Sequence, residues 1–255
     1  MDGTGFEDAA GIPFRLVDTR SETVLLTAEN VLGYFVAPDG EPPQLVTFAG
    51  VHHLSADRRK AEEAALRVVD HRGEEIGTYY LGRVRAAYQE PPAVTGERYP
   101  DVRYDFFGFT EEYPHAAEIW RTWADEGPSE HGAWARLPAA WHASWLHVVQ
   151  NSWFATGRRA TRYGTGATVV LDGSAVTGRD AFYCALGEAV NGPRGYFGSN
   201  LDALFDCLRT SRAEGAAPFG LVWRDLPASR DALGADYTGR VLDVFAEGGV
   251  AVRTA

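Results

Sequence analysis

The last third of the chain alternates short apolar segments with amphipathic ones, and this alternation restricts it to an α/β fold. Residues 168–173 and 219–226 are short strand-like runs, and residues 250–255 form a third run at the end of the sequence. Between them, residues 178–190 and 234–248 repeat apolar side chains at helical spacing. Strands separated by helices tend to pair in parallel, so we expect a small, mostly parallel sheet with packed helices.

The first part of the chain is rich in β-strand signals. Runs of β-branched and aromatic residues separated by Gly, Pro and Asp predict strands at 14–18, 23–28, 31–37, 45–50 and 76–88. Residues 57–69 favour helix at their beginning and strand at their end, and a longer loop is expected at 37–43. Helical composition predicts helices within 112–127 and 138–160. We therefore expect a β-rich α+β domain here.

A polar, glycine-bearing stretch at 157–167 is interpreted as a linker with a solvated basic patch. We therefore expect two domains, residues 1–163 and 164–255. Most tryptophans precede this stretch, and they are expected in the core or between domains, with a binding surface as the alternative: Trp120, Trp123, Trp134, Trp141, Trp145 and Trp153.

Composition and charge exclude several classes of protein. A formal charge of −11 over 255 residues is opposite to that of a nucleic-acid binder. The sequence has no basic and apolar leader at its start and no apolar run of about eighteen residues, so neither a secretory signal nor a membrane span is expected. The two cysteines, Cys184 and Cys207, make no disulfide framework. We expect a cytoplasmic protein in which both are reduced and buried in helices.

The stretch YFGSNLDALFDCL, residues 196–208, has the pattern of a loop followed by an amphipathic helix. Ser199 or Asn200 is expected to cap the helix. At 100° per residue, one stripe faces the core and comprises Leu201, Leu204, Phe205 and Leu208.

Asp202 and Asp206 fall together on the exposed side of this helix, four residues apart. Like charges at this spacing destabilise a helix by a few tenths of a kcal/mol. The helix dipole compensates Asp202 in the first turn, whereas Asp206 lies too far in and has only a weak pair with Arg209. The pair is either an ordinary solvated helix face or a site whose partner is on another molecule.

The segment GYFGSNLDALFDCL, residues 195–208, resembles the loop and helix of the barstar family of ribonuclease inhibitors. The order of flanking segments is also similar, with VVLDG before it and LVWRDL, RVLDVFAEG and a final strand after it. The resemblance covers residues 167–255. It implies a three-stranded parallel sheet with packed helices, whose loop and helix fill a ribonuclease active site.

The resemblance also assigns roles to residues of this segment. Asp206 would occupy the place of a substrate phosphate, with Asp202 as its acidic neighbour. Tyr196 would pack its ring on the catalytic His of the nuclease, or else it is a loop aromatic packed on the core. Gly198 and Asn200 would supply backbone and polar contacts from the loop.

Two features depart from the family pattern. Phe205 stands where the family commonly has Trp, which keeps the bulk and loses the indole N–H. The last helix is expected to be short, with Glu247 as the acidic candidate for peripheral contacts. Both features leave open a change in affinity or in the choice of partner.

We therefore expect the protein to inhibit a microbial ribonuclease, of the barnase type or a ribonuclease toxin, in a one-to-one complex. The alternative is a barstar-like interaction module that binds another kind of protein. No cofactor or metal is expected, since His142 and His147 are five residues apart and His52 and His53 are adjacent. No nucleophile–base pattern supports an enzyme in the first domain.

Overall fold

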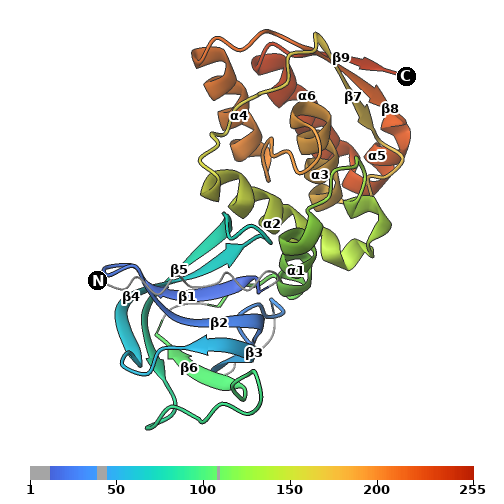
Figure 1. Cartoon of the computed structure of the whole chain (residues 1–255). Coiled ribbons are helices and arrows are strands. Elements are labelled where there is room, and N and C mark those ends of the chain that lie inside the picture. Colours follow the sequence, from blue (N-terminus) through green and yellow to red (C-terminus); the bar gives the residue numbers. More distant parts are fainter. Residues whose placement is uncertain (1–11, 39–44, 108–109) are drawn as a thin grey trace. The chain divides into compact units, whose positions relative to one another are not determined.

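The computed structural model describes residues 12–38, 45–107 and 110–255, and the chain divides into two compact units after Gly127 (Figure 1). Most of the loop expected at 37–43 lies outside the described residues. We call the part up to Gly127 unit 1 and residues 128–255 unit 2. Unit 1 is β-rich with one helix, and unit 2 is an α/β domain, which confirms the predicted fold classes.

Unit 1 contains a closed barrel of six antiparallel strands in the order β1-β2-β3-β6-β5-β4. The strands are β1 (Phe14–Asp18), β2 (Thr23–Leu32), β3 (Val46–Leu54), β4 (Lys60–Val69), β5 (Glu75–Ala86) and β6 (Val102–Phe106). Because β4 also pairs with β1, each of these strands has a neighbour on both sides. Phe14, Leu16 and Phe48 are completely buried in its core.

Hydrogen bonding between strands determines the conformation of segments for which the sequence pattern is ambiguous. Residues 60–69 carry helix-forming side chains, yet they form β4, because neighbours on both sides satisfy their backbone groups. The two strands expected at 23–28 and 31–37 are a single strand, β2, which ends at Leu32. β6 is not among the predicted strands, because its alternating pattern extends over only five residues.

One helix, α1 (Ala116–Glu126), completes unit 1. Its Trp120 and Trp123 are buried, and the Trp120 indole donates a hydrogen bond of 2.7 Å to the hydroxyl of Tyr79. Trp134, Trp145 and Trp153 are buried in unit 2. The predicted core role is therefore confirmed for these five tryptophans, which serve two separate cores, whereas Trp141 is only half-buried.

Unit 2 is built on a three-stranded parallel sheet in the order β7-β8-β9 (Figure 1). Its strands are β7 (Thr168–Asp172), β8 (Gly220–Arg224) and β9 (Ala251–Thr254). Its helices are α2 (His142–Ala155), α3 (Arg179–Asn191), α4 (Leu201–Ala213), α5 (Leu226–Leu233) and α6 (Ala235–Glu247), preceded by the short turns η1 (Trp134–Arg136) and η2 (Ala139–Trp141). In the described ranges, no helix has the length and apolar character needed to span a bilayer.

Aromatic packing and one buried hydroxyl hold the centre of unit 2 together. The rings of Phe182 and Trp223 stack at 5.2 Å between centroids, and both are fully buried. The Trp223 indole donates to Ser229, whose hydroxyl donates in turn to the carbonyl of Gly173. These bonds satisfy buried polar atoms where β7 and β8 end.

The last helix lies where the sequence predicts it, at 234–248. α6 has thirteen residues, the same length as α3 and α4. α5 was not expected, because its eight residues are too few to show a helical period.

The compact division after Gly127 lies well before the predicted boundary between residues 163 and 164. α2 packs against α3, so the segment before the predicted linker is part of unit 2. Within the stretch 157–167, Thr161 and Arg162 are buried and most other residues are exposed. Hydrogen bonds from Arg162 to the hydroxyl of Ser211 and the carbonyl of Ala217 attach this exposed stretch to unit 2.

Candidate partner-binding site

The loop before α4 is held close to the helix by a glycine. Gly198 has φ +98°, a conformation that side-chain-bearing residues rarely adopt. A Cβ at this position would lie 2.8 Å from the backbone nitrogen of Leu204. The loop therefore approaches the first turn of α4 more closely than any other residue at 198 would allow.

Asn200 begins the helix. Its backbone is extended, and its side-chain oxygen accepts a hydrogen bond of 2.8 Å from the backbone N–H of Ala203. This is N-capping geometry, and it confirms one of the two predicted caps. The side-chain oxygen of Asn200 is thus used within the helix.

The buried face of α4 comprises Leu204, Cys207, Leu208 and Ser211. Phe205 was expected among the core residues, but its side chain is 39% exposed. The side of α4 that packs on the core is centred closer to Cys207, whereas the side predicted from the sequence is centred closer to Leu201 and Phe205. The helix is therefore rotated so that Phe205 faces solvent. Both cysteines are free and buried, as predicted.

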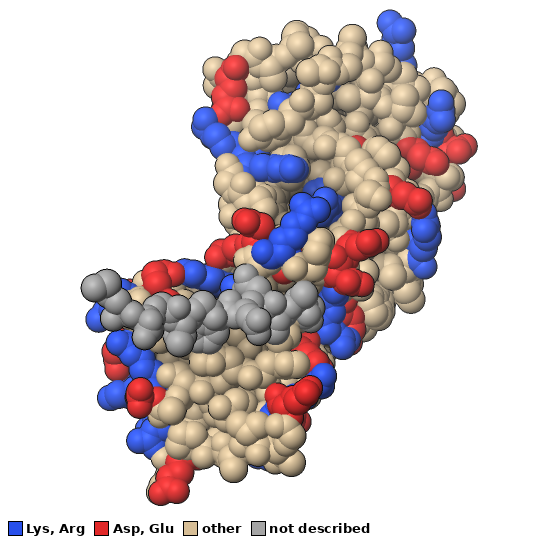
Figure 2. All heavy atoms as spheres, in the orientation of Figure 1, with Lys and Arg blue, Asp and Glu red and all other residues tan. Residues whose placement is uncertain are grey.

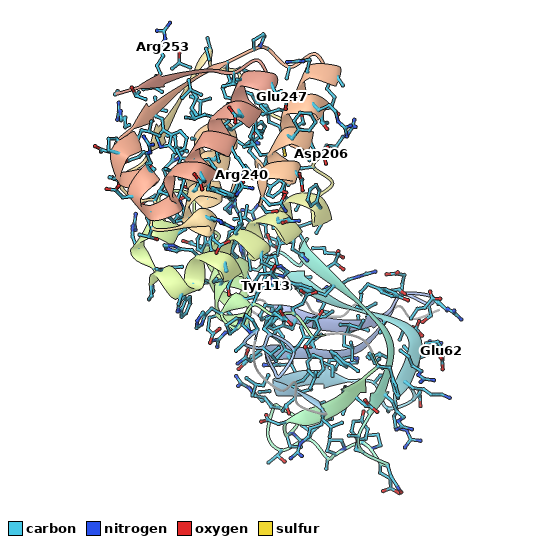
Figure 3. All side chains as sticks on the ribbon, turned by 180° about the vertical axis from the view of Figure 1, so that it is seen from behind. Glu62, Tyr113, Asp206, Arg240, Glu247 and Arg253 are labelled. Carbon is cyan, nitrogen blue, oxygen red and sulfur yellow. The ribbon has the colours of Figure 1, made fainter. Side chains whose placement is uncertain are left out.

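Asp202, Phe205 and Asp206 share the exposed side of α4, and we call them the α4 face (Figure 3 labels Asp206). Asp206 accepts a hydrogen bond of 2.9 Å from Arg209 in an exposed ion pair. Asp206 is therefore not unpartnered, although an exposed pair of this kind contributes only about 0.3–0.5 kcal/mol. In the described part of the chain, Asp202 has no ion pair.

Tyr196 is buried, with 3% of its surface exposed. Its ring packs edge-on against Phe154 of α2, with 5.4 Å between centroids. Burial raises the pKa of its hydroxyl to about 12, Cys207 and Asp206 beside it add to the rise, and a hydrogen bond with Ser199 opposes it. The structure therefore favours the second interpretation of Tyr196, a loop aromatic packed on the core.

Glu247 is exposed at the end of α6, away from the first turn of α4. Its backbone carbonyl accepts a bond of 3.4 Å from Arg212, which lies in the last turn of α4. Ten residues of helix separate Arg212 from Asp202, or about 15 Å. Figure 3 shows Glu247 and Asp206 on the two packed helices. The structure therefore places Glu247 beside the last turn of α4 and does not bring it together with Asp202.

Asn191, which is not among the predicted site residues, anchors the loop before α4 through hydrogen bonds. Its amide donates to the carbonyls of Tyr196 and Thr161, and its oxygen accepts from the backbone N–H of Tyr163. The signal for such a residue is an Asn at a helix end directly before a glycine, here Gly192. One side chain thus ties the loop to the segment that precedes β7.

Unit 2 has no excess of either charge, since residues 128–255 contain 12 acidic and 12 basic side chains and the formal charge of −11 belongs to residues 1–127. Figure 2 shows acidic and basic side chains mixed over the visible face of each unit. Selective attraction must therefore come from the local arrangement of charges, and the α4 face provides one.

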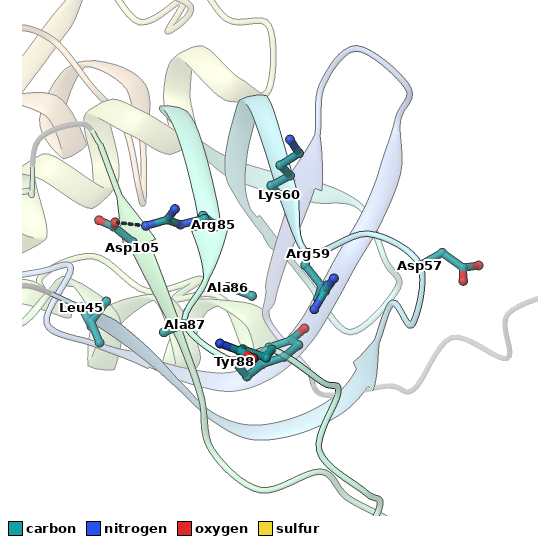
Figure 4. A pocket seen from close by; sticks show the side chains of 10 residues that line it. Leu45, Asp57, Arg59, Lys60, Arg85, Ala86, Ala87, Tyr88 and Asp105 are labelled. Atoms are coloured by element: carbon teal, nitrogen blue, oxygen red, sulfur yellow. Dashed lines mark ion pairs between the residues drawn. The ribbon is translucent and has the colours of Figure 1, made fainter.

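Unit 1 has a hollow of about 550 Å³ on the barrel (Figure 4). Arg85 is directed to Asp105, with 3.7 Å between charged atoms, while Lys60 and Asp57 point away from the centre. Arg59 is directed towards Tyr88, so it is the one labelled charged side chain of the hollow that neither pairs nor points away (Figure 4). Over the described ranges, no group of three or more His, Cys, Asp or Glu side chains is arranged to hold a metal ion.

Part of this chain matches a known protein family. Residues 166–253 match the family model described as Barstar (barnase inhibitor), and the N-terminal region matches no family. No curated protein matches the chain. The matched region contains the loop, α4 and the parallel sheet, which confirms the resemblance seen in the sequence. This part of the protein is similar to barnase inhibitors, a similarity that points to a protein-interaction module.

Proposed function

We propose, from the match of residues 166–253 to the barstar family, that this protein inhibits a microbial ribonuclease by covering its active site with the α4 face. The observation that carries the proposal is that Asp202, Phe205 and Asp206 are exposed together on a capped helix of the matched region. The target is a ribonuclease of the barnase type or a ribonuclease toxin, bound one to one.

The chemistry of the α4 face fits such a target. A ribonuclease that stabilises a charged phosphoryl transition state must hold cationic groups in its cleft. Two carboxylates on a rigid helix can pair with those groups, and they offer no bond to cleave. Because the Asp206–Arg209 pair is exposed, its exchange for a cation of the nuclease sacrifices little free energy.

Titration of the purified protein into a cleavage assay of a barnase-type ribonuclease tests the proposal. We expect activity to fall linearly and to vanish at one equivalent. Asp206→Ala should weaken binding by about 2–5 kcal/mol, the range measured when one partner of a buried charge pair is truncated in complexes such as barnase–barstar. Asp231→Ala, which removes an exposed carboxylate from α5, is the matched control and should bind normally.

One observation favours a second candidate, a module that binds a partner other than a ribonuclease. The burial of Tyr196 removes an aromatic contact that the resemblance assigns to the nuclease complex. If a folded protein leaves cleavage unchanged at a tenfold excess, inhibition of this nuclease class is excluded, and the second candidate is favoured.

A further inference from the structure

Phe154, near the end of α2, covers Tyr196 with an aromatic surface of its own. The two rings contact edge to face, at 5.4 Å and 64°. Tyr196 is 3% exposed, whereas Phe154 is 44% exposed. α2 precedes the family match, which begins at residue 166. An aromatic ring from outside the matched region therefore occupies the surface above the loop.

The ring of Phe154 lies against the loop that leads into the acidic helix. Tyr196 is four residues before the cap Asn200, and Gly198 holds the loop against Leu204 in the first turn of α4. The charge of Asp206 reaches the Tyr196 hydroxyl and adds to its raised pKa. The loop thus connects Phe154, which is 44% exposed, to the α4 face within one compact unit.

The position of Phe154 is fixed by the surrounding structure. α2 packs on α3, and the segment after it is tied to α4 through Ser211, which accepts from the backbone N–H of Arg162 at 2.9 Å. Trp153, next to Phe154, is buried and donates to the carbonyl of Arg159 at 2.7 Å. A preorganised aromatic side chain loses little conformational entropy when it binds.

We infer that α2 extends the partner-binding surface and that Phe154 makes the aromatic contact with the ribonuclease that the buried Tyr196 cannot make. The inference rests on the proposed function and adds α2 to its site. Exposed aromatics beside charged groups are typical centres of binding energy, because the ring excludes water from the neighbouring ion pairs. The occupant is the same ribonuclease, since the carboxylates beside the ring require a cationic partner.

The test compares dissociation constants of full-length variants for a barnase-type ribonuclease. We expect Phe154→Ala to weaken binding at least tenfold and Phe154→Tyr to restore most of it, because Tyr keeps the ring. Phe107→Ala is the matched control, since Phe107 is 49% exposed in unit 1, and it should bind like wild type. Denaturant unfolding of each variant shows that it is folded.

The outcomes separate this inference from the proposed function. If Asp206→Ala weakens binding but Phe154→Ala binds as tightly as wild type, or more tightly, α2 is not part of the surface and the inference is overturned. If the folded wild-type protein does not bind the ribonuclease at all, the proposed function fails and the inference fails with it.

Discussion

At the scale of single residues, unit 2 accommodates charged side chains in its interior by giving them polar partners. Arg162 is buried, donates to the carbonyl of Ala217 at 2.7 Å and lies 4.7 Å from the ring centre of Phe219. Glu188 is buried and accepts from the indole of Trp134 at 3.1 Å, and burial raises its pKa. Both residues fasten segments outside the family match to the matched region.

His147 on α2 makes the stability of unit 2 dependent on pH. Burial lowers its pKa from 6.5 to about 4. Because the unfolded state takes up the proton first, stability is fully present above pH 6.5 and is lost as the pH falls towards 4, by up to about 3 kcal/mol. His147→Gln removes this titration. We expect the difference in unfolding free energy between variant and wild type to change by about 2 kcal/mol between pH 7 and pH 4.5 in urea titrations. Parallel profiles would contradict the assignment.

At the scale of elements, the loop and α4 act as one unit because the backbone geometry of the loop is fixed. Gly198 places the loop against the first turn, Asn200 caps that turn, and Asn191 holds the carbonyl of Tyr196 at 2.7 Å. The α4 face is therefore presented from a rigid support. Rigidity of this kind favours affinity, since ordering on binding is avoided.

A Gly198→Ala substitution should disturb this support. The added Cβ would have to occupy space within 2.8–2.9 Å of backbone atoms of Leu204, in a left-handed conformation that is already unfavourable. We expect a loss of about 1–3 kcal/mol in unfolding free energy and weaker ribonuclease binding. Gly192→Ala is the control, because Gly192 has φ +82° with open space around it. Equal losses for both variants would show that the contact with Leu204 is unimportant.

The elements also show what a sequence can and cannot predict. The strands and helices of the parallel sheet follow from local patterns, and so do the capped helix and the exposure of Asp202 and Asp206. The outward turn of Phe205 and the burial of Tyr196 do not, because both depend on packing against distant segments. β4 was ambiguous for a related reason, since one of its two strand neighbours, β1, lies far away in sequence.

At the scale of the whole molecule, the structural unit is larger than the family match. The match covers residues 166–253, whereas the compact unit begins at residue 128. The additional segment contributes buried side chains, among them Leu146, Val149 and Trp153. It also contributes the hydrogen bonds to Ser211 and Asn191. Residues 128–165 are thus an integral part of the fold of unit 2.

Two fragments of the chain test whether residues 128–165 are needed for the fold of unit 2. We expect residues 128–255 to unfold in one cooperative transition. Residues 166–255 should be less stable by more than about 3 kcal/mol, because several buried apolar side chains, each contributing about 1.5–3 kcal/mol, lose their partners. Denaturant unfolding followed by circular dichroism measures both. Equal midpoints for the two fragments would place the boundary where the family match begins.

The closed barrel of unit 1 limits the ways in which another protein could engage it. A partner that adds a strand needs a row of free backbone N–H and C=O groups along a sheet edge. In the described barrel, β1 to β6 each lie between two hydrogen-bonded neighbours. β6 pairs with only three residues of β3 and three of β5, so within the described barrel a peptide could add a strand only along the remaining parts of these two strands, and recognition elsewhere on the barrel has to rely on side chains and loops.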